Sequence, residues 1–450
     1  MRAGVLALGC LAAGVVHAQS TAGFFNPMSA SQNGIHLYDV SVFGGYFTGG
    51  TPSGIPTAGA NSLYMSGPFT IANVSASFGW TQNHDRSSFA VRYSPSYIAY
   101  PDQTDVNAMG HSFSLNWNRK LGQKWAASAS ATGLIASQEQ MYFAPNALGS
   151  AASLPTTFED LAAAVLTGKF TDAQLAASLT GASARLLPEQ TYLYGQRIAS
   201  ASVTSSLSYA PSGRTSFHIS ASMNRVQGLS SGNAGSAASN SLIPQTTTGN
   251  ASFGWGYSVS PRTNIGIEVG TVRTFSRLQD GYASNASVSI GHRITEHWLV
   301  QGRVGGGLIT YTRRAFAAPA TPQYTAGGAI GYKLRSHTML ASYDRSIGDA
   351  YGLGAGTTSA ATAGWAWKSP GSKWSLHADY GYQRTDGSHL LNTESWRATG
   401  GLARSLTNHM FLSVQYSYFT YPPIQGSVAG LLGAESGVSM GLTWSPSQYR

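Results

Sequence analysis

The chain has 450 residues, of which only 10% are charged, and it contains 53 glycines, a single cysteine and a formal net charge of +9. Charged residues make up about 25% of typical soluble domains, so this content argues against an ordinary cytoplasmic enzyme. Abundant glycine with few charges is expected where many strands face lipid or pack closely. The composition therefore favours a membrane β-protein.

Residues 1–18 have the features of a cleaved signal peptide for the Sec pathway. Arg2 provides the positive end, residues 5–16 form the apolar stretch, and a small-x-small cleavage pattern ends the segment. Cleavage would leave residues 19–450 as a single mature domain. Cleavage would also remove Cys10, the single cysteine, and so exclude disulfides. Lipidation of Cys10 is disfavoured because the apolar run before it is short. Beyond this segment no run reaches the roughly 18 apolar residues of a membrane helix, which leaves a periplasmic protein, a secreted protein or an outer-membrane barrel.

Segment after segment of the remaining chain alternates apolar or aromatic residues with small polar ones, which is the pattern of strands with two different faces. In 251–259 the odd positions are Ala, Phe, Trp, Tyr and Val, whereas the even positions are Ser and Gly. Segments 217–223 and 374–382 show the same alternation. A soluble sandwich also alternates, so the pattern by itself leaves both kinds of β-protein open.

The connections between these segments alternate short and long, as in an outer-membrane barrel with short turns at one end. The short ones are 82–86, 120–124, 210–214, 260–263, 294–297, 334–337, 369–373 and 406–409. The longer ones are 48–68, 99–108, 138–196, 226–248, 276–282, 314–322, 347–358, 385–392 and 421–434. Together they predict an all-β fold, a transmembrane antiparallel up-and-down β-barrel of eighteen strands with both termini in the periplasm. Segment 35–47 alternates poorly, so sixteen strands is the alternative.

Aromatic residues provide an independent test, because a membrane barrel places Trp and Tyr at both ends of its strands. Beside the short turns stand Trp80, Trp117, Trp125, Tyr209, Tyr257, Trp298, Tyr332, Trp367, Trp374 and Trp444. At the opposite strand ends stand Tyr97, Phe275, Tyr311, Tyr343, Tyr382 and Tyr418. This sorting favours two interface belts over the core of a soluble sandwich or propeller.

The long link 138–196 carries the only convincing helical signals of the mature chain. Thr157 and Thr171 each precede an acidic or amide residue by three positions, as in a capping box, and predict two short helices. The apolar stripes of these helices need burial. We expect the pair to fold inward and to narrow or plug the barrel. A cap above the barrel mouth, or packing against a neighbouring protomer, is the alternative.

A pattern recurs near the far end of the strands that leave the short turns. An apolar residue, an aromatic residue or Thr is followed, two positions later, by an arginine. The arginines are Arg225, Arg273, Arg313, Arg345 and Arg384. A spacing of two puts both side chains on one face. On the outer face these arginines would anchor lipid headgroups or lipopolysaccharide, with their stems over apolar surface and their heads at phosphates. Solvated arginines, or pairs with carboxylates such as Asp344 and Asp349, are the alternative.

The small polar face of each strand should line the lumen. Continuing the alternation places five cations and three anions on it, namely Arg92, Arg303, Lys333, Lys368, Arg397, Glu268, Asp344 and Asp379. This weak positive excess predicts a mild preference for anions, unless the charges pair across the lumen. A glycine bulge at 305–307 would reverse the facing of its neighbours, so the facing of Arg303 depends on it.

Catalysis has one candidate constellation, His377 and Asp379, which are two residues apart on the inner face, with His218 and many serines elsewhere. A serine-rich lumen makes such coincidences common. No His-Glu-x-x-His, Gly-x-Ser-x-Gly or P-loop pattern occurs, and the mature chain would have no cysteine. We therefore expect no enzymatic activity, no cofactor and no metal site, and export to the envelope excludes nucleic acid as a partner.

The mature chain resembles the Gram-negative outer-membrane β-barrel porins, including porin families with short Ser-Pro turns. The most specific element is the last strand, where Val438, Met440, Leu442 and Trp444 alternate like the terminal strand that barrel-assembly machinery recognises. Trp444 is followed by Ser-Pro-Ser-Gln-Tyr-Arg, so the usual terminal aromatic is displaced. The resemblance implies a place in the cell outer membrane, with outer-membrane lipid and lipopolysaccharide, the assembly machinery and small hydrophilic solutes as partners.

The sequence thus predicts a porin-like channel for passive diffusion of small hydrophilic solutes. One alternative is a barrel associated with exopolysaccharide secretion. Another is a non-conducting structural or adhesive barrel, occluded by the insertion. A homo-oligomer is left open, since no clear apolar patch marks a protomer interface.

Overall fold

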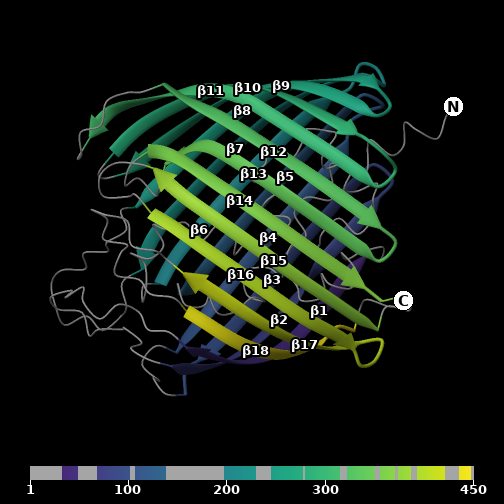
Figure 1. Ribbon diagram of the computed structural model, residues 1–450, viewed down its shortest axis with the longest axis vertical. Coiled ribbons are helices and arrows are strands. Elements are labelled where there is room, and N and C mark those ends of the chain that lie inside the picture. Colours follow the sequence, from purple (N-terminus) through teal and green to yellow (C-terminus); the bar gives the residue numbers. More distant parts are fainter. Residues whose placement is uncertain are drawn as a thin grey trace.

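The computed structural model describes residues 33–48, 68–101, 107–137, 197–229, 245–276, 279–314, 322–349, 355–369, 373–386, 393–420 and 435–446. They form one antiparallel sheet of eighteen strands that closes into a barrel (Figure 1). The strands are β1 (Gly34–Thr48), β2 (Phe69–His84), β3 (Ser87–Ala99), β4 (Ala108–Lys120), β5 (Trp125–Ser137), β6 (Arg197–Tyr209), β7 (Thr215–Leu229), β8 (Thr246–Ser260), β9 (Thr263–Ser276), β10 (Gln279–Arg293), β11 (Trp298–Arg314), β12 (Pro322–Leu334), β13 (His337–Asp349), β14 (Ala355–Lys368), β15 (Trp374–Asp386), β16 (Thr393–Ser405), β17 (Met410–Thr420) and β18 (Glu435–Trp444).

Every strand pairs with the next one along the chain, and β1 closes the ring by pairing with β18. The predicted count of eighteen strands is therefore confirmed, and the alternative of sixteen is wrong. Within the described ranges no helix is long and apolar enough to cross a membrane. The predicted signal peptide, 1–18, and the predicted helical insertion, 138–196, lie outside the described residues.

The short connections lie at one end of the barrel, and the strand ends that precede the long connections lie at the other. All eight predicted short turns join consecutive strands, from β2 with β3 to β16 with β17. Figure 1 shows these turns at one end of the barrel, and the strand ends that lead to the longer links at the other. Because the strands alternate in direction and are even in number, β1 begins and β18 ends on the short-turn side.

The first strand contains an irregularity that explains its poor alternation. The register between β1 and β2 shifts between Leu37 and Asp39, so Tyr38 is an extra residue on its strand. Tyr38 and Asp39 are both buried on the inner side, 4% and 6% exposed, whereas Leu37 and Val42 are exposed on the outer side. The two-residue period therefore breaks at Tyr38, although the strand continues.

The two faces of the barrel wall differ in chemistry. Large apolar side chains stand exposed on the outer face, and Val203, Phe253 and Val304 are 55%, 47% and 65% exposed. On the inner face, hydroxyl groups of neighbouring strands bond to one another, as in the pair Ser128 and Ser206 at 2.6 Å. A continuous apolar exterior of this kind requires an apolar surrounding medium.

Aromatic residues stand at both ends of the outer face. At the short-turn ends, the ring of Trp125 stacks on Tyr209 with centroids 4.4 Å apart, and Trp298 lies 4.5 Å from Tyr332. At the opposite ends, exposed aromatic side chains include Tyr97, Phe275 and Tyr418, whereas Tyr343 lies in the middle of β13. The side chain of Tyr311 lies outside the described part. Two such belts are what the two interfaces of a bilayer require.

The inner face is not polar throughout. Buried apolar side chains cluster on β1 to β3, toward the ends that lead to the longer links, and comprise Phe43, Phe47, Phe69, Ile71, Ile98 and Tyr100. The rings of Phe47 and Phe69 stack with centroids 5.5 Å apart. Glycine makes room for this cluster, since a Cβ atom at Gly437 would overlap the Phe47 ring.

Candidate functional site

All eight charged residues that the sequence assigns to the lumen lie on the inner face of the wall. They are Arg92, Glu268, Arg303, Lys333, Asp344, Lys368, Asp379 and Arg397. Their facing follows from the cross-strand rungs, because residues on one rung point to the same side of a sheet. Lys368, for example, shares a rung with Ser375, which is 4% exposed. The structure brings five of these eight residues, together with Asp39, into three ion pairs.

Arg303 and Asp344 form an ion pair that crosses one strand. Arg303 on β11 and Asp344 on β13 both stand opposite Gly327 of β12, so the three residues share one rung. Gly327 has no side chain, and the guanidinium reaches over it to donate to Asp344 Oδ1. The two side chains keep 13% and 8% exposure. Pairing of β10 with β11 is continuous through 305–307, so the bulge that would have reversed Arg303 is not formed.

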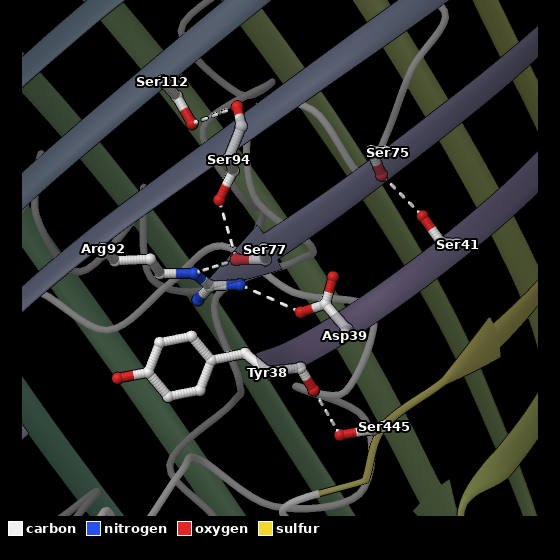
Figure 2. Close-up of polar contacts among 9 residues, drawn as sticks. All are labelled: Tyr38, Asp39, Ser41, Ser75, Ser77, Arg92, Ser94, Ser112 and Ser445. Atoms are coloured by element: carbon white, nitrogen blue, oxygen red, sulfur yellow. Dashed lines mark hydrogen bonds and ion pairs between the residues drawn. The ribbon is translucent and has the colours of Figure 1, made fainter. Parts of the chain in front are cut away.

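A second ion pair, on the N-terminal strands β1 to β3, also reaches across one strand, and Figure 2 shows it. Arg92 on β3 reaches across β2, where its Nε donates to the hydroxyl of Ser77. Its Nη2 donates to Asp39 Oδ2 on β1 at 3.0 Å. The Tyr38 ring lies 5.2 Å from the guanidinium carbon and adds a cation–π contact. Sequence alternation does not place Asp39 in the lumen, because the bulge at Tyr38 conceals its facing.

A third ion pair joins two neighbouring strands diagonally. Arg397 on β16 stands opposite Gly381 of β15, two residues from Asp379. Its Nη2 donates to Asp379 Oδ2 at 2.7 Å, and the side chains are 10% and 11% exposed. The ring of His377 lies against Gly401, where a Cβ atom would overlap it. The carboxylate of the predicted His377 and Asp379 constellation is thus held by Arg397.

Ion pairing leaves the middle of the inner wall nearly neutral among the residues that the structure describes. Each of the three inward arginines of this region has a carboxylate partner, and opposite charges in contact largely cancel at a distance. Glu268 is a fourth inward acid, and it has no ion pair within the part of the chain that the structure describes. Lys333 and Lys368 lie apart from these pairs, at the short-turn ends of β12 and β14.

Four of the predicted headgroup anchors, Arg225, Arg273, Arg345 and Arg384, lie on the outer face, toward the longer links. Arg345 on β13 is the most closely held of them. Its guanidinium carbon lies 4.4 Å from the centre of the Tyr324 ring, and the group donates to Thr357 at 3.2 Å and Ser359 at 3.3 Å. Asp344 points to the other side of the wall, so the alternative pairing of Arg345 with Asp344 is wrong.

The other arginines of this set differ in their contacts. Arg273 lies over the Phe275 ring at 4.2 Å and is 3.6 Å from a carboxylate oxygen of Asp280. Arg225 and Arg384 are exposed on the same outer face. Arg313 pairs with β10 through its backbone, and its side chain lies outside the described part.

No protein-family model matches the chain, and no curated protein matches its sequence. Among solved structures it is similar to OccK9 (OpdG) of Pseudomonas aeruginosa, with 11% identity and a TM-score of 0.44 over 91% of this chain and 98% of that one. OccK2 (OpdF) of the same organism, in complex with glucuronate, has 8% identity and a TM-score of 0.45 over 92% and 100%. A BenF-like porin from Pseudomonas fluorescens Pf-5 has 10% identity and a TM-score of 0.43 over 91% and 98%.

The membrane assignment rests on the wall of this chain itself. Closure of the eighteen strands removes every sheet edge, which is the condition for a β-structure to exist in lipid. The outer face is apolar between two aromatic belts, and the inner face carries hydroxyls and ion pairs. These are the features of a β-barrel that spans a membrane. The chain therefore has the fold of a closed, eighteen-stranded transmembrane β-barrel.

Proposed function

We propose that the barrel is a channel through which small hydrophilic solutes diffuse passively across the outer membrane. The observation that carries the proposal is the inner wall, where arginines are paired with carboxylates and Ser and Thr hydroxyls supply much of the remaining polar surface. Away from the short-turn rim, such a wall offers hydrogen bonds to water and small polar solutes without a strong field of one sign.

We further propose that the channel prefers anions mildly. Adding Asp39 to the predicted inward charges makes five cations and four anions, and the three ion pairs remove three of each. Lys333, Lys368 and Glu268 lie outside these three pairs, and cations exceed anions by one among the nine residues. An excess this small biases the fluxes of anions and cations but does not exclude either.

The same proposal includes the orientation of the barrel and its contacts. The short turns and both termini would face the periplasm, because long connections are extracellular in bacterial barrels. Outer arginines such as Arg345 would then meet lipopolysaccharide phosphates, which bind guanidinium groups strongly. Strand β18 would be the element that the assembly machinery recognises.

Planar lipid bilayers test the channel directly. The purified mature protein should give stable ohmic current steps, and its reversal potential across a KCl gradient should have the sign of weak anion selectivity. Protein that migrates as folded in a heat-modifiability gel but passes no current would contradict the channel and favour an occluded barrel. A cation-selective reversal potential would contradict only the anion preference.

The predicted insertion, 138–196, supplies a second test. If its two helices narrow the lumen, deletion of residues 158–180 should enlarge the single-channel conductance. An unchanged conductance in a folded deletion variant would show that this segment lies outside the path of the ions.

A further inference from the structure

The short-turn end of the barrel carries a repeated backbone contact between neighbouring hairpins. In all eight short turns, the residue just before the outgoing strand accepts a hydrogen bond from a backbone N–H at, or just beyond, the end of the strand that follows. The Arg86 carbonyl accepts from Lys120 at 2.7 Å, and the Arg262 carbonyl accepts from Arg293 at 2.8 Å. These bonds extend each strand ladder by one rung, so eight equivalent terminal rungs surround the barrel mouth.

The terminal rungs face the lumen side of the rim. Successive rungs of a sheet alternate between its two faces. The rung before the terminal one carries outer-face aromatic residues, such as Trp125 with Tyr209 and Trp298 with Tyr332. The terminal rung therefore belongs to the inner face.

The charged residues of these rungs are all basic. Of their sixteen residues, nine are Arg or Lys, two are His and none is acidic. The rungs are Arg86 with Lys120, Lys124 with Ala210, Arg214 with Ser258, Arg262 with Arg293, His297 with Lys333, Ser336 with Lys368, Lys373 with Ser405 and His409 with Ser445. The acids of the short turns, Asp85 and Glu296, lie outside the rungs, and Arg335 adds a further cation beside Ser336.

The backbone contact does not explain this composition. A terminal rung needs one N–H and one carbonyl, which any residue other than proline provides. Nine like charges around one mouth repel one another, and that repulsion opposes folding. The rim therefore concentrates positive charge where the fold itself has no need of it.

We propose that these nine cationic residues, the basic ring, form a binding site for soluble multivalent anions that carry several phosphate or carboxylate groups. Adjacent strands lie about 4.8 Å apart, so cations of adjacent rungs stand roughly 10 Å apart or slightly more. A single exposed ion pair contributes little to binding, and a monovalent anion would pass the ring. A multivalent anion engages several members at once and is retained. Binding here adds a site to the proposed channel and does not require that the barrel conducts.

Titration calorimetry of the folded mature barrel in detergent tests the ring, with inorganic tripolyphosphate as the probe. We expect binding at about 0.1 M KCl that weakens at least tenfold at about 1 M, because the Debye length falls from about 10 Å to about 3 Å. A triple variant, Arg262→Gln, Arg293→Gln and Lys333→Gln, removes three neighbouring ring charges and should weaken binding about tenfold.

The matched control removes three positive charges from the outer face, by the changes Arg273→Gln, Arg345→Gln and Arg384→Gln. It should keep the affinity of the unaltered protein. An equal loss in both triple variants would overturn the proposal, because net charge alone would then explain the attraction. Migration in a heat-modifiability gel shows whether each variant is folded. If the triple ring variant does not fold, the single variant Arg262→Gln is measured in its place, and a smaller loss of affinity is expected.

Absence of tripolyphosphate binding by the unaltered folded barrel would also overturn the proposal, and is the result expected if the ring serves an acidic protein instead. In planar bilayers, tripolyphosphate should reduce the current when added on one side only. Binding without any current would refute the proposed channel and support the ring. Current without binding would refute the ring and leave the channel standing.

Discussion

Replacing Asp344 by asparagine should remove the carboxylate that the guanidinium of Arg303 contacts on the inner wall. The Arg303 side chain is only 13% exposed, and its partner reaches it across Gly327 from two strands away. Removing one member of a buried ion pair costs about 3–5 kcal/mol. Because both side chains keep some contact with the lumen, we expect the lower end of that range, about 3 kcal/mol.

Urea titration of the barrel in lipid vesicles measures this loss, with the folded fraction read from a heat-modifiability gel. For a slope of roughly 3 kcal/mol per M urea, the midpoint of the Asp344→Asn variant should fall by about 1 M. The Glu268→Gln variant is the matched control, because it removes an inward carboxylate that has no ion pair among the described residues. Its stability should change by less than about 0.5 kcal/mol.

A double-mutant cycle decides whether the pair itself is responsible. Adding Arg303→Gln to the Asp344→Asn variant removes the uncompensated charge and should recover most of the lost stability. Two results would refute the reasoning. One is a midpoint for Asp344→Asn no lower than that for Glu268→Gln, and the other is a double variant whose loss equals the sum of the two single losses.

Three further outcomes follow from individual contacts. The Gly254→Ala variant should be less stable in urea, because the added Cβ would overlap the His218 ring, and His218→Ser in the same chain should restore the midpoint. The Arg345→Gln variant should lose part of the thermal stabilisation that lipopolysaccharide provides in a melting experiment, whereas Arg404→Gln, on the outer face at the short-turn end, should keep it. The Ser445→Ala variant loses a buried hydroxyl that donates to a β1 carbonyl at 2.6 Å and should lose about 1 kcal/mol in the same urea titration.

The strands and the facing of most of their residues are properties of local sequence. In 251–259 the alternation of aromatic residues with Ser and Gly assigns each side chain to a face without knowledge of the neighbouring strands. The period of a strand is two residues, so a segment of nine contains its own evidence. The eight short turns follow in the same way, because each lies between two alternating segments. Closure on eighteen strands was predictable for this reason, with β1 as the one doubtful element.

Which charges meet was decided by tertiary structure. Arg303 lies 41 residues from Asp344 in the sequence, and Arg92 lies 53 from Asp39. Their contact depends on the register of two consecutive strand pairs, and a shift of one residue in either would separate them. The facing of Asp39 depends in addition on a bulge, which exists only in the pairing of β1 with its neighbours. Alternation alone therefore places three arginines on the lumen wall but does not identify the carboxylate that each one contacts.

The basic ring likewise combines a part that can be read from the sequence with a part that depends on the tertiary structure. Each of its cations is visible in the sequence at a short turn, and two of them, Lys333 and Lys368, were predictable as inward charges. Hydrogen bonds between neighbouring strands at the short-turn end bring them together on the terminal rungs around the mouth. The period of a strand is local and can be read from neighbouring residues, whereas the alignment of one hairpin with the next is set by long-range pairing, which arises only when the sheet closes.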